Sequence, residues 1–94
     1  MIRHIVMFSA KRSEDIPAIE AGLGLLAGIP EHVHFEVSLN LKCDQLANDI
    51  AVVVYAEFVD EAALARYKQH PLYEEAIRIV RPLRGMRVAA DLSI

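Results

Sequence analysis

Cysteine, long apolar runs and an excess of positive charge are all scarce or missing in this chain. The single cysteine, Cys43, excludes an internal disulfide and fits a reducing cytoplasm. No apolar stretch approaches the roughly 18–20 residues of a membrane span, and Met1–Phe8 is too short for a signal peptide with its cleavage site. The net charge is −3, whereas domains that bind nucleic acid are usually basic. We therefore expect a cytoplasmic protein that binds neither nucleic acid nor a membrane.

Apolar residues, by contrast, are abundant. They make up 54% of the 94 residues, above the roughly 45–50% of ordinary soluble domains. A chain of this length is predicted to form a single domain over residues 1–94. Such a domain buries only about 60–68% of its unfolded surface and is marginally stable alone. An interface with another subunit is the simplest place for the excess apolar surface.

Four segments are predicted to be β-strands. Ile2–Phe8 and Ile50–Phe58 are apolar on both faces, which is typical of strands covered on both sides. Val33–Leu41 alternates apolar and polar residues, which predicts a half-buried strand. Met86–Ile94 is predicted to be the last strand, after a turn at Arg84-Gly85.

Two helical regions are predicted between these strands. The first covers about residues 13–28, and the polar stretch 42–48 is predicted to be a loop. The second begins at Asp60, an N-cap residue, and resumes over 72–83 after a break at His70-Pro71. Proline disfavours a helical conformation in the residue before it and begins the next helix well. The buried stripe of the first helix is predicted to be Ile16, Ile19, Leu23 and Leu26.

The predicted order, β-α-β-β-α-β, is the ferredoxin-like plan of the α+β class. This plan has a four-stranded antiparallel sheet with helices on one face. Its usual strand order, 4-1-3-2, places the first and third strands in the centre, and those are the two segments that are apolar on both faces. A sheet whose second face is also apolar needs a partner. We therefore expect a homodimer formed through the sheet face.

Several short motifs follow one another along the chain in a recognisable order. They are Ile2-Arg-His-Ile-Val-Met-Phe8, Phe35-Glu-Val37 with Asn40, Asp49, Phe58, Asp60-Glu-Ala-Ala-Leu64, Tyr67-x-x-His70-Pro71, Pro82-Leu83 and Asp91. In order and spacing they resemble the stress-responsive dimeric α/β-barrel (Dabb) family. The resemblance implies a ferredoxin-like subunit whose sheet forms a barrel with that of a second subunit. It also implies a small cavity in each subunit between sheet and helices.

The resemblance also implies candidate chemistry. The clearest enzymes of the family resemble plant polyketide cyclases, which close a ring by aldol chemistry without a cofactor. They use a strand-one histidine, a helix-two tyrosine and a histidine three residues after that of the His-Pro pair. His4 and Tyr67 match the first two, but the third position is Tyr73, and a further histidine expected on strand three is Val52. Tyrosine, with a pKa of about 10, is a poor base at neutral pH. We expect such a cyclase activity only after Tyr73→His.

Five polar residues are predicted to form one site. In the predicted topology the first strand lies antiparallel to the last, so that Asp91 reaches His4, orients its imidazole and favours its protonated form.

The functional interpretation is a pocket for a small phenolic, ketone or acid ligand, without cofactor or metal. The alternative function is a cofactor-independent cyclase, isomerase or monooxygenase acting on an aromatic or polyketide-like substrate. The structural interpretation is a helix-capping histidine and core tyrosines. The ligand-binding candidates are His4, Tyr67, His70, Tyr73 and Asp91, and the catalytic candidates are His4, Tyr67 and Tyr73.

A second polar pattern is the alternation of His32, His34 and Glu36. Side chains two residues apart on a strand point to the same side, and two histidines with a carboxylate are able to bind a transition metal. A solvated face of an edge strand explains the pattern equally. The family resemblance implies no metal there, and we expect none.

Arginines recur at every third position at residues 78, 81, 84 and 87. The first two could share a helix face and hold an anionic ligand. Alternatively they are surface charges, with Glu74 pairing to Arg78 one turn away.

Overall fold

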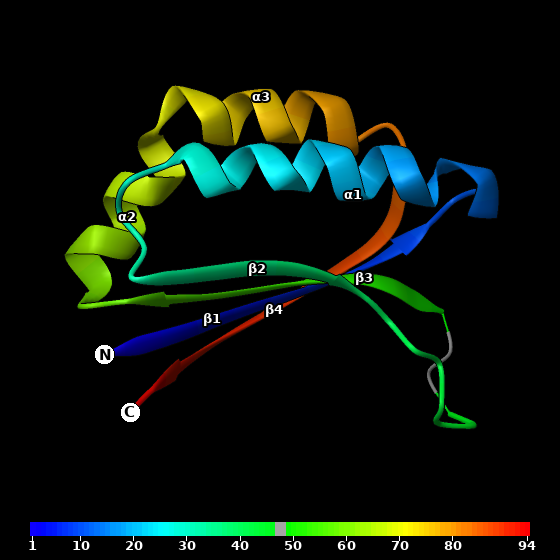
Figure 1. Ribbon diagram of the computed structural model, residues 1–94, viewed down its shortest axis with the longest axis horizontal. Coiled ribbons are helices and arrows are strands. Elements are labelled where there is room, and N and C mark those ends of the chain that lie inside the picture. Colours follow the sequence, from blue (N-terminus) through cyan, green and yellow to red (C-terminus); the bar gives the residue numbers. More distant parts are fainter. Residues whose placement is uncertain (47–48) are drawn as a thin grey trace.

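The chain forms two layers, a sheet and a set of helices that cover one of its faces (Figure 1). The computed structural model describes residues 1–46 and 49–94. The strands are β1 (Ile2–Ala10), β2 (His34–Leu39), β3 (Ile50–Phe58) and β4 (Arg84–Ser93), all antiparallel in the order β2-β3-β1-β4. The helices are α1 (Ile16–Gly24), α2 (Glu61–Gln69) and α3 (Pro71–Val80). The predicted ferredoxin-like fold and its strand order are confirmed.

The helix boundaries follow from local chemistry. At α2 the predicted cap is confirmed, because the Asp60 side chain accepts a hydrogen bond of 2.9 Å from the Ala63 backbone N–H. At α1 neither Ser13 nor Asp15 makes a side-chain cap. The chain enters α1 through a 3-10 turn, Ser13–Asp15, and leaves it through a second one, Leu25–Gly28. Among the described residues, no helix has the length and apolar character that crossing a lipid bilayer requires.

The predicted turn before the last strand is displaced. Arg84 and Gly85 belong to β4, where Arg84 pairs with Ala10, and the turn lies at residues 81–83. Pro82 lacks the N–H that would continue α3, so the helix ends at Val80. The chain therefore reverses direction earlier than the glycine suggested, and β4 is longer than predicted.

The hydrophobic core lies between the sheet and the helices. It includes Val6 and Phe8 of β1, Val54 of β3 and Ile19 and Leu23 of α1, all 5% exposed or less. Of the predicted α1 stripe, Ile19, Leu23 and Leu26 are buried and Ile16 packs at the edge.

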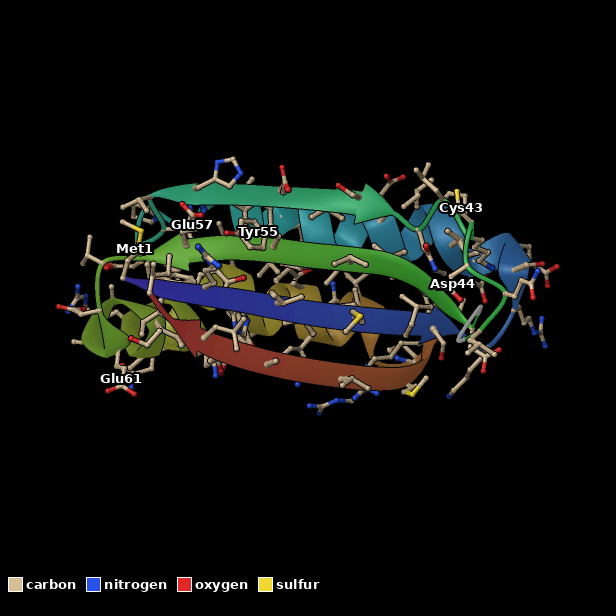
Figure 2. The ribbon with its side chains drawn as sticks, turned by 90° about the horizontal axis from the view of Figure 1, so that it is seen from below. Met1, Cys43, Asp44, Tyr55, Glu57 and Glu61 are labelled. Atoms are coloured by element: carbon tan, nitrogen blue, oxygen red, sulfur yellow. The ribbon has the colours of Figure 1, made fainter. Side chains whose placement is uncertain are left out.

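The second face of the sheet is only half apolar, which corrects the prediction that both central strands are apolar on both faces. Ile5 and Met7 of β1 and Val88 of β4 make one half apolar. Tyr55 and Glu57 of β3 also lie on this face (Figure 2). The apolar character of Ile50–Phe58 hid the fact that its two polar residues are two apart and therefore share one side.

Two helical glycines differ in what surrounds them. A Cβ on Gly22 would lie 2.9 Å from both Ile79 Cγ2 and Val80 Cγ2, whereas a Cβ on Gly24 would meet no atom within 4 Å. We expect Gly22→Ala to destabilise the fold by about 1–3 kcal/mol, because α1 and α3 must separate. We expect Gly24→Ala to stabilise it by about 0.4–1 kcal/mol, because alanine reduces the entropy of the unfolded chain. Urea unfolding of both variants measures the difference, and equal effects would contradict the packing explanation.

Candidate functional site

A cavity of about 300 Å³ lies between the sheet and the helices. This volume is at the lower end of the range of about 300–1,000 Å³ that is usual for small-molecule sites. Leu23 and Leu26 from the α1 side and Ile77 of α3 line the space without filling it. Phe58 is fully buried beside His4, outside the lining. The remaining apolar wall consists of Val6, Phe8, Val54, Ala76 and Val80.

His4 and Asp91 form a hydrogen-bonded pair at the sheet side of the cavity. The register of β1 and β4 places the two residues opposite each other, and His4 Nδ1 lies 2.5 Å from Asp91 Oδ1. A carboxylate only accepts hydrogen bonds, so Nδ1 carries the proton and donates it. His4 is 1% exposed, whereas the Asp91 side chain is 42% exposed. Asp91 does not line the cavity and acts there only through His4.

Asp91 favours the protonated form of His4, as predicted, but burial has the larger effect on the charge state. Burial lowers the pKa of His4 more than the hydrogen bond and negative charge of Asp91 raise it, so that the pKa lies below its ordinary value of 6.5. The imidazole is therefore neutral at pH 7, and its Nε2 has a free lone pair. Among the described residues, Nε2 has no hydrogen-bond partner. None of their fully buried side-chain nitrogen or oxygen atoms lacks a partner, so Nε2 is not fully enclosed by the protein. Because His4 lines the cavity, Nε2 is available to a bound molecule.

Tyr67 and Tyr73 reach the same cavity from two helices. The Tyr67 ring contacts His4 and Tyr73 edge to face, at centroid distances of 6.1 Å and 5.4 Å. Burial raises the pKa of Tyr67, so its hydroxyl stays protonated at neutral pH and is able to donate a hydrogen bond. The two tyrosines converge because the chain changes direction between α2 and α3 (Figure 1).

His70 stabilises that change of direction between α2 and α3. Its backbone is extended, with φ −69° and ψ 143°, and its Nδ1 accepts a 3.1 Å hydrogen bond from the Leu72 backbone N–H. His70 does not line the cavity, unlike His4, Tyr67 and Tyr73. The structure therefore places this predicted ligand-binding residue in a capping role, and we leave it out of the proposed site.

The predicted alternation of His32, His34 and Glu36 does not produce a cluster. His32 precedes β2 and turns to the helix side, where its ring stacks on Phe35 at 5.0 Å. His34 and Glu36 lie on the opposite face of the sheet, 3.4 Å apart. No group of three or more histidine, cysteine or acidic residues in residues 1–46 and 49–94 has the geometry to hold a metal ion.

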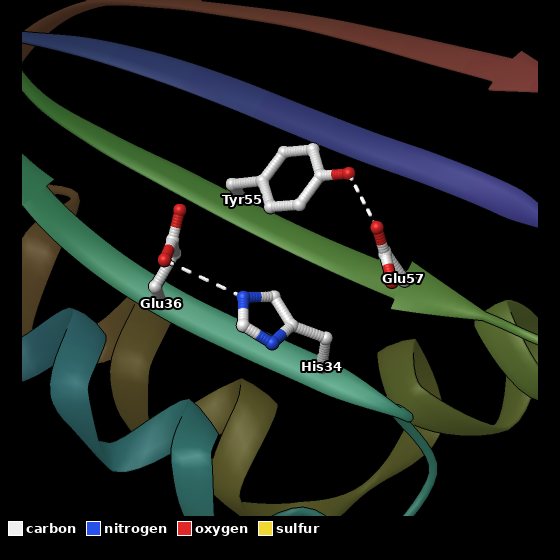
Figure 3. Close-up of polar contacts among 4 residues, drawn as sticks. All are labelled: His34, Glu36, Tyr55 and Glu57. Carbon is white, nitrogen blue, oxygen red and sulfur yellow. Dashed lines mark hydrogen bonds and ion pairs between the residues drawn. The ribbon is translucent and has the colours of Figure 1, made fainter.

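Sequence reasoning missed a polar cluster on the open face of the sheet. The Tyr55 hydroxyl donates a 2.6 Å hydrogen bond to Glu57 Oε2, next to the His34–Glu36 pair (Figure 3). The hydrogen bond to Glu57 raises the pKa of Tyr55. The antiparallel register brings the four together by pairing His34 with Glu57 and Glu36 with Tyr55. The two-residue spacing within each pair was visible in the sequence, but the register that brings the two pairs together was not.

The arginine series divides between two places. Arg78 points away from the cavity and pairs with Glu75, not with the predicted Glu74, and this contact lowers the pKa of Glu75. Arg81, Arg84 and Arg87 all line the cavity.

Known proteins that are similar to this chain have the same fold. The family model of the stress responsive A/B barrel domain matches residues 2–94. A dimeric ferredoxin-like protein of unknown function from Thermobifida fusca YX is 26% identical, with a TM-score of 0.83 over 99% of this chain and 90% of that one. A Dabb family protein with a ferredoxin-like fold from Mesorhizobium loti is also 26% identical, with a TM-score of 0.81 over 99% and 95%.

A known enzyme has the same fold at lower identity. Hydroxynitrile lyase from Passiflora edulis is 22% identical, with a TM-score of 0.81 over 99% of this chain and 92% of that one. At this identity the likeness concerns the fold alone. No curated protein matches the chain in sequence.

Proposed function

Because the chain belongs to the stress-responsive A/B barrel domain family, we propose that it is a homodimeric protein that binds a small organic ligand in the cavity between sheet and helices. The observation that carries this proposal is a cavity of about 300 Å³ with apolar walls, lined also by two buried polar groups, His4 and Tyr67. Apolar walls with a few placed polar groups are typical of ligand sites. A purely structural domain would gain stability by filling such a space.

The proposed dimer forms through the open face of the sheet. On β4 this face exposes Met86, Val88 and Leu92, each 43–47% exposed in the single chain. They continue the apolar surface of Ile5 and Met7 on the neighbouring strand. Large apolar side chains gathered on one face of a small protein are typical of an interface. Solved structures with this fold are described as dimeric, including the one from Thermobifida fusca.

A thermal-shift screen tests ligand binding. We expect some members of a panel of small phenols, ketones and carboxylic acids to raise the unfolding temperature, because a ligand that binds only the folded state stabilises it by mass action. At a ligand concentration of about 100 times Kd the gain is about 2.7 kcal/mol, which is several degrees for a domain of this size.

A matched pair of variants shows whether the ligand occupies the cavity. Ala76 is buried and lines the cavity, so Ala76→Leu should fill part of it and abolish the shift. Ala62 lies exposed on α2, and Ala62→Leu should leave the shift unchanged. A panel without any hit, or hits that bind Ala76→Leu as well as the unmodified protein, would overturn the proposed function.

A second candidate function is cofactor-independent proton transfer. The observation that favours it is the neutral His4, oriented by Asp91 through Nδ1 and offering Nε2 to the cavity. A neutral imidazole held within reach of a substrate proton is able to act as a general base. Tyr67 could then donate a hydrogen bond to a carbonyl oxygen of the substrate. Ring closure of the cyclase type remains expected only for Tyr73→His.

A further inference from the structure

We propose that the cavity takes an amphipathic anion, with an apolar or aromatic body inside and a carboxylate at the mouth, bound by Arg81, Arg84 and Arg87. This inference rests on the proposed ligand-binding function, because it names the class of ligand for the same cavity. It also assigns a role to the arginine series, which the predicted site did not include.

The three arginines come from one short segment that borders the cavity. Arg81 follows α3, and Arg84 is the first residue of β4. Arg87 lies opposite Phe8 in the sheet, on the face that the helices cover. All three line the cavity, because the turn at residues 81–83 carries the chain from α3 to β4.

The charge of the cavity lining is unbalanced. The lining contains three arginines and no aspartate or glutamate, a formal charge of +3 in a protein whose net charge is −3. In the part of the chain that the structure describes, the arginines with carboxylate partners are Arg12, Arg66 and Arg78. Three guanidiniums around one cavity whose lining contains no carboxylate favour an anion there.

The guanidinium groups also keep most of their hydrogen-bonding capacity. Arg84 donates from Nη1 to the Gly85 carbonyl at 3.0 Å, which uses one of its five N–H donors. A carboxylate accepts two parallel hydrogen bonds from one guanidinium, and such charge-assisted pairs are about twice as strong as neutral ones. A carboxylate is therefore the group that fits the mouth best.

The interior of the cavity fits the rest of such a molecule. Its walls are apolar, and His4 and Tyr67 supply the polar contacts. Burial is the main cause of the pKa shifts of both residues, and the positive charge of Arg87 adds a lowering effect on each. His4, Tyr67 and Arg87 line the same cavity, so that one bound acid has all three groups around it.

Comparison of acids with their amides tests the inference. We would titrate the full chain with phenylacetate, cinnamate and octanoate, and with the amide of each, by calorimetry at low ionic strength. We expect the acids to bind at least about tenfold more tightly than the amides, because only the acids make charge-assisted contacts. Added salt should weaken the binding of the acids and leave the amides unaffected.

Arginine variants locate the effect. The double variant Arg84→Gln/Arg87→Gln should lose the preference for the acids and bind the amides as before. Arg78→Gln, which removes an arginine outside the cavity, should change neither affinity. If amides bind as tightly as acids, or if the double variant keeps the preference, the arginines are solvated surface charges. The anion inference is then wrong, while the proposed ligand-binding function stands. If no acid and no amide binds, the anion inference is overturned, and the proposed function is judged by the wider panel.

Discussion

Val88→Asp should convert the proposed dimer into monomers. Val88 lies on the open face of β4, opposite Met7, and is 43% exposed in the single chain. In a dimer formed through this face it would be buried, and an unpaired buried carboxylate costs several kcal/mol. Since about 1.4 kcal/mol is a factor of ten in Kd, we expect the dissociation constant to rise at least about a hundredfold. Light scattering at micromolar concentration measures the mass.

A matched control separates the interface from general surface effects. Leu41 is 87% exposed and lies outside the strands of the sheet, so Leu41→Asp should leave the dimer intact. Both variants should keep the circular dichroism spectrum of the unmodified protein, because surface substitutions usually change the free energy of unfolding by less than about 0.5 kcal/mol. A monomeric unmodified protein, or a dimeric Val88→Asp variant, would contradict the proposed interface.

The sequence was sufficient to predict the fold because the spacing of apolar residues in each segment matches the helix or strand that forms there. β3 has the predicted bounds, Ile50–Phe58. The predicted half-buried strand Val33–Leu41 is shorter in the structure: β2 covers His34–Leu39, with only Phe35 and Val37 half-buried, whereas Val33, Leu39 and Leu41 are exposed. The approach of Asp91 to His4 followed from the antiparallel order of β1 and β4. The polarity of the open face did not follow, because it depends on which residues of adjacent strands are in register.

The charge states and the arginine cluster could not be predicted from the sequence. Whether Asp91 or burial has the larger effect on the pKa of His4 depends on how deeply the imidazole is buried. That burial depends on how the helices pack on the sheet. A period of three matches neither the helical period of 3.6 residues nor the strand period of two. The three arginines of the cavity share a surface only because the chain turns at residues 81–83 between α3 and β4.

His4→Gln should abolish any proton-transfer activity of the cavity. In the second candidate function, Nε2 of His4 takes a proton from the carbon next to a bound carbonyl group. Asp91 stabilises the resulting imidazolium, and Tyr67 donates to the enolate oxygen. In D2O the imidazolium exchanges this proton for a deuteron from the solvent, and the deuteron then adds to the same carbon. The loss of the methyl proton signal of para-acetylbenzoate, followed by NMR, measures the exchange. We expect a decrease of about 10²–10⁴-fold for His4→Gln, which is the usual contribution of a general base.

The pH dependence of this exchange distinguishes a base from a residue that only shapes the cavity. The imidazole accepts a proton only when it is neutral, and burial sets its pKa below 6.5. The exchange rate should therefore be constant near neutral pH and fall only as the pH drops through that lowered pKa. The control His34→Gln changes a histidine on the opposite face of the sheet and should keep both rate and profile. Exchange no faster than in buffer, or a profile that His4→Gln leaves unchanged, would restrict the cavity to binding. The neutral Nε2 of His4 would then serve as a hydrogen-bond acceptor for the ligand.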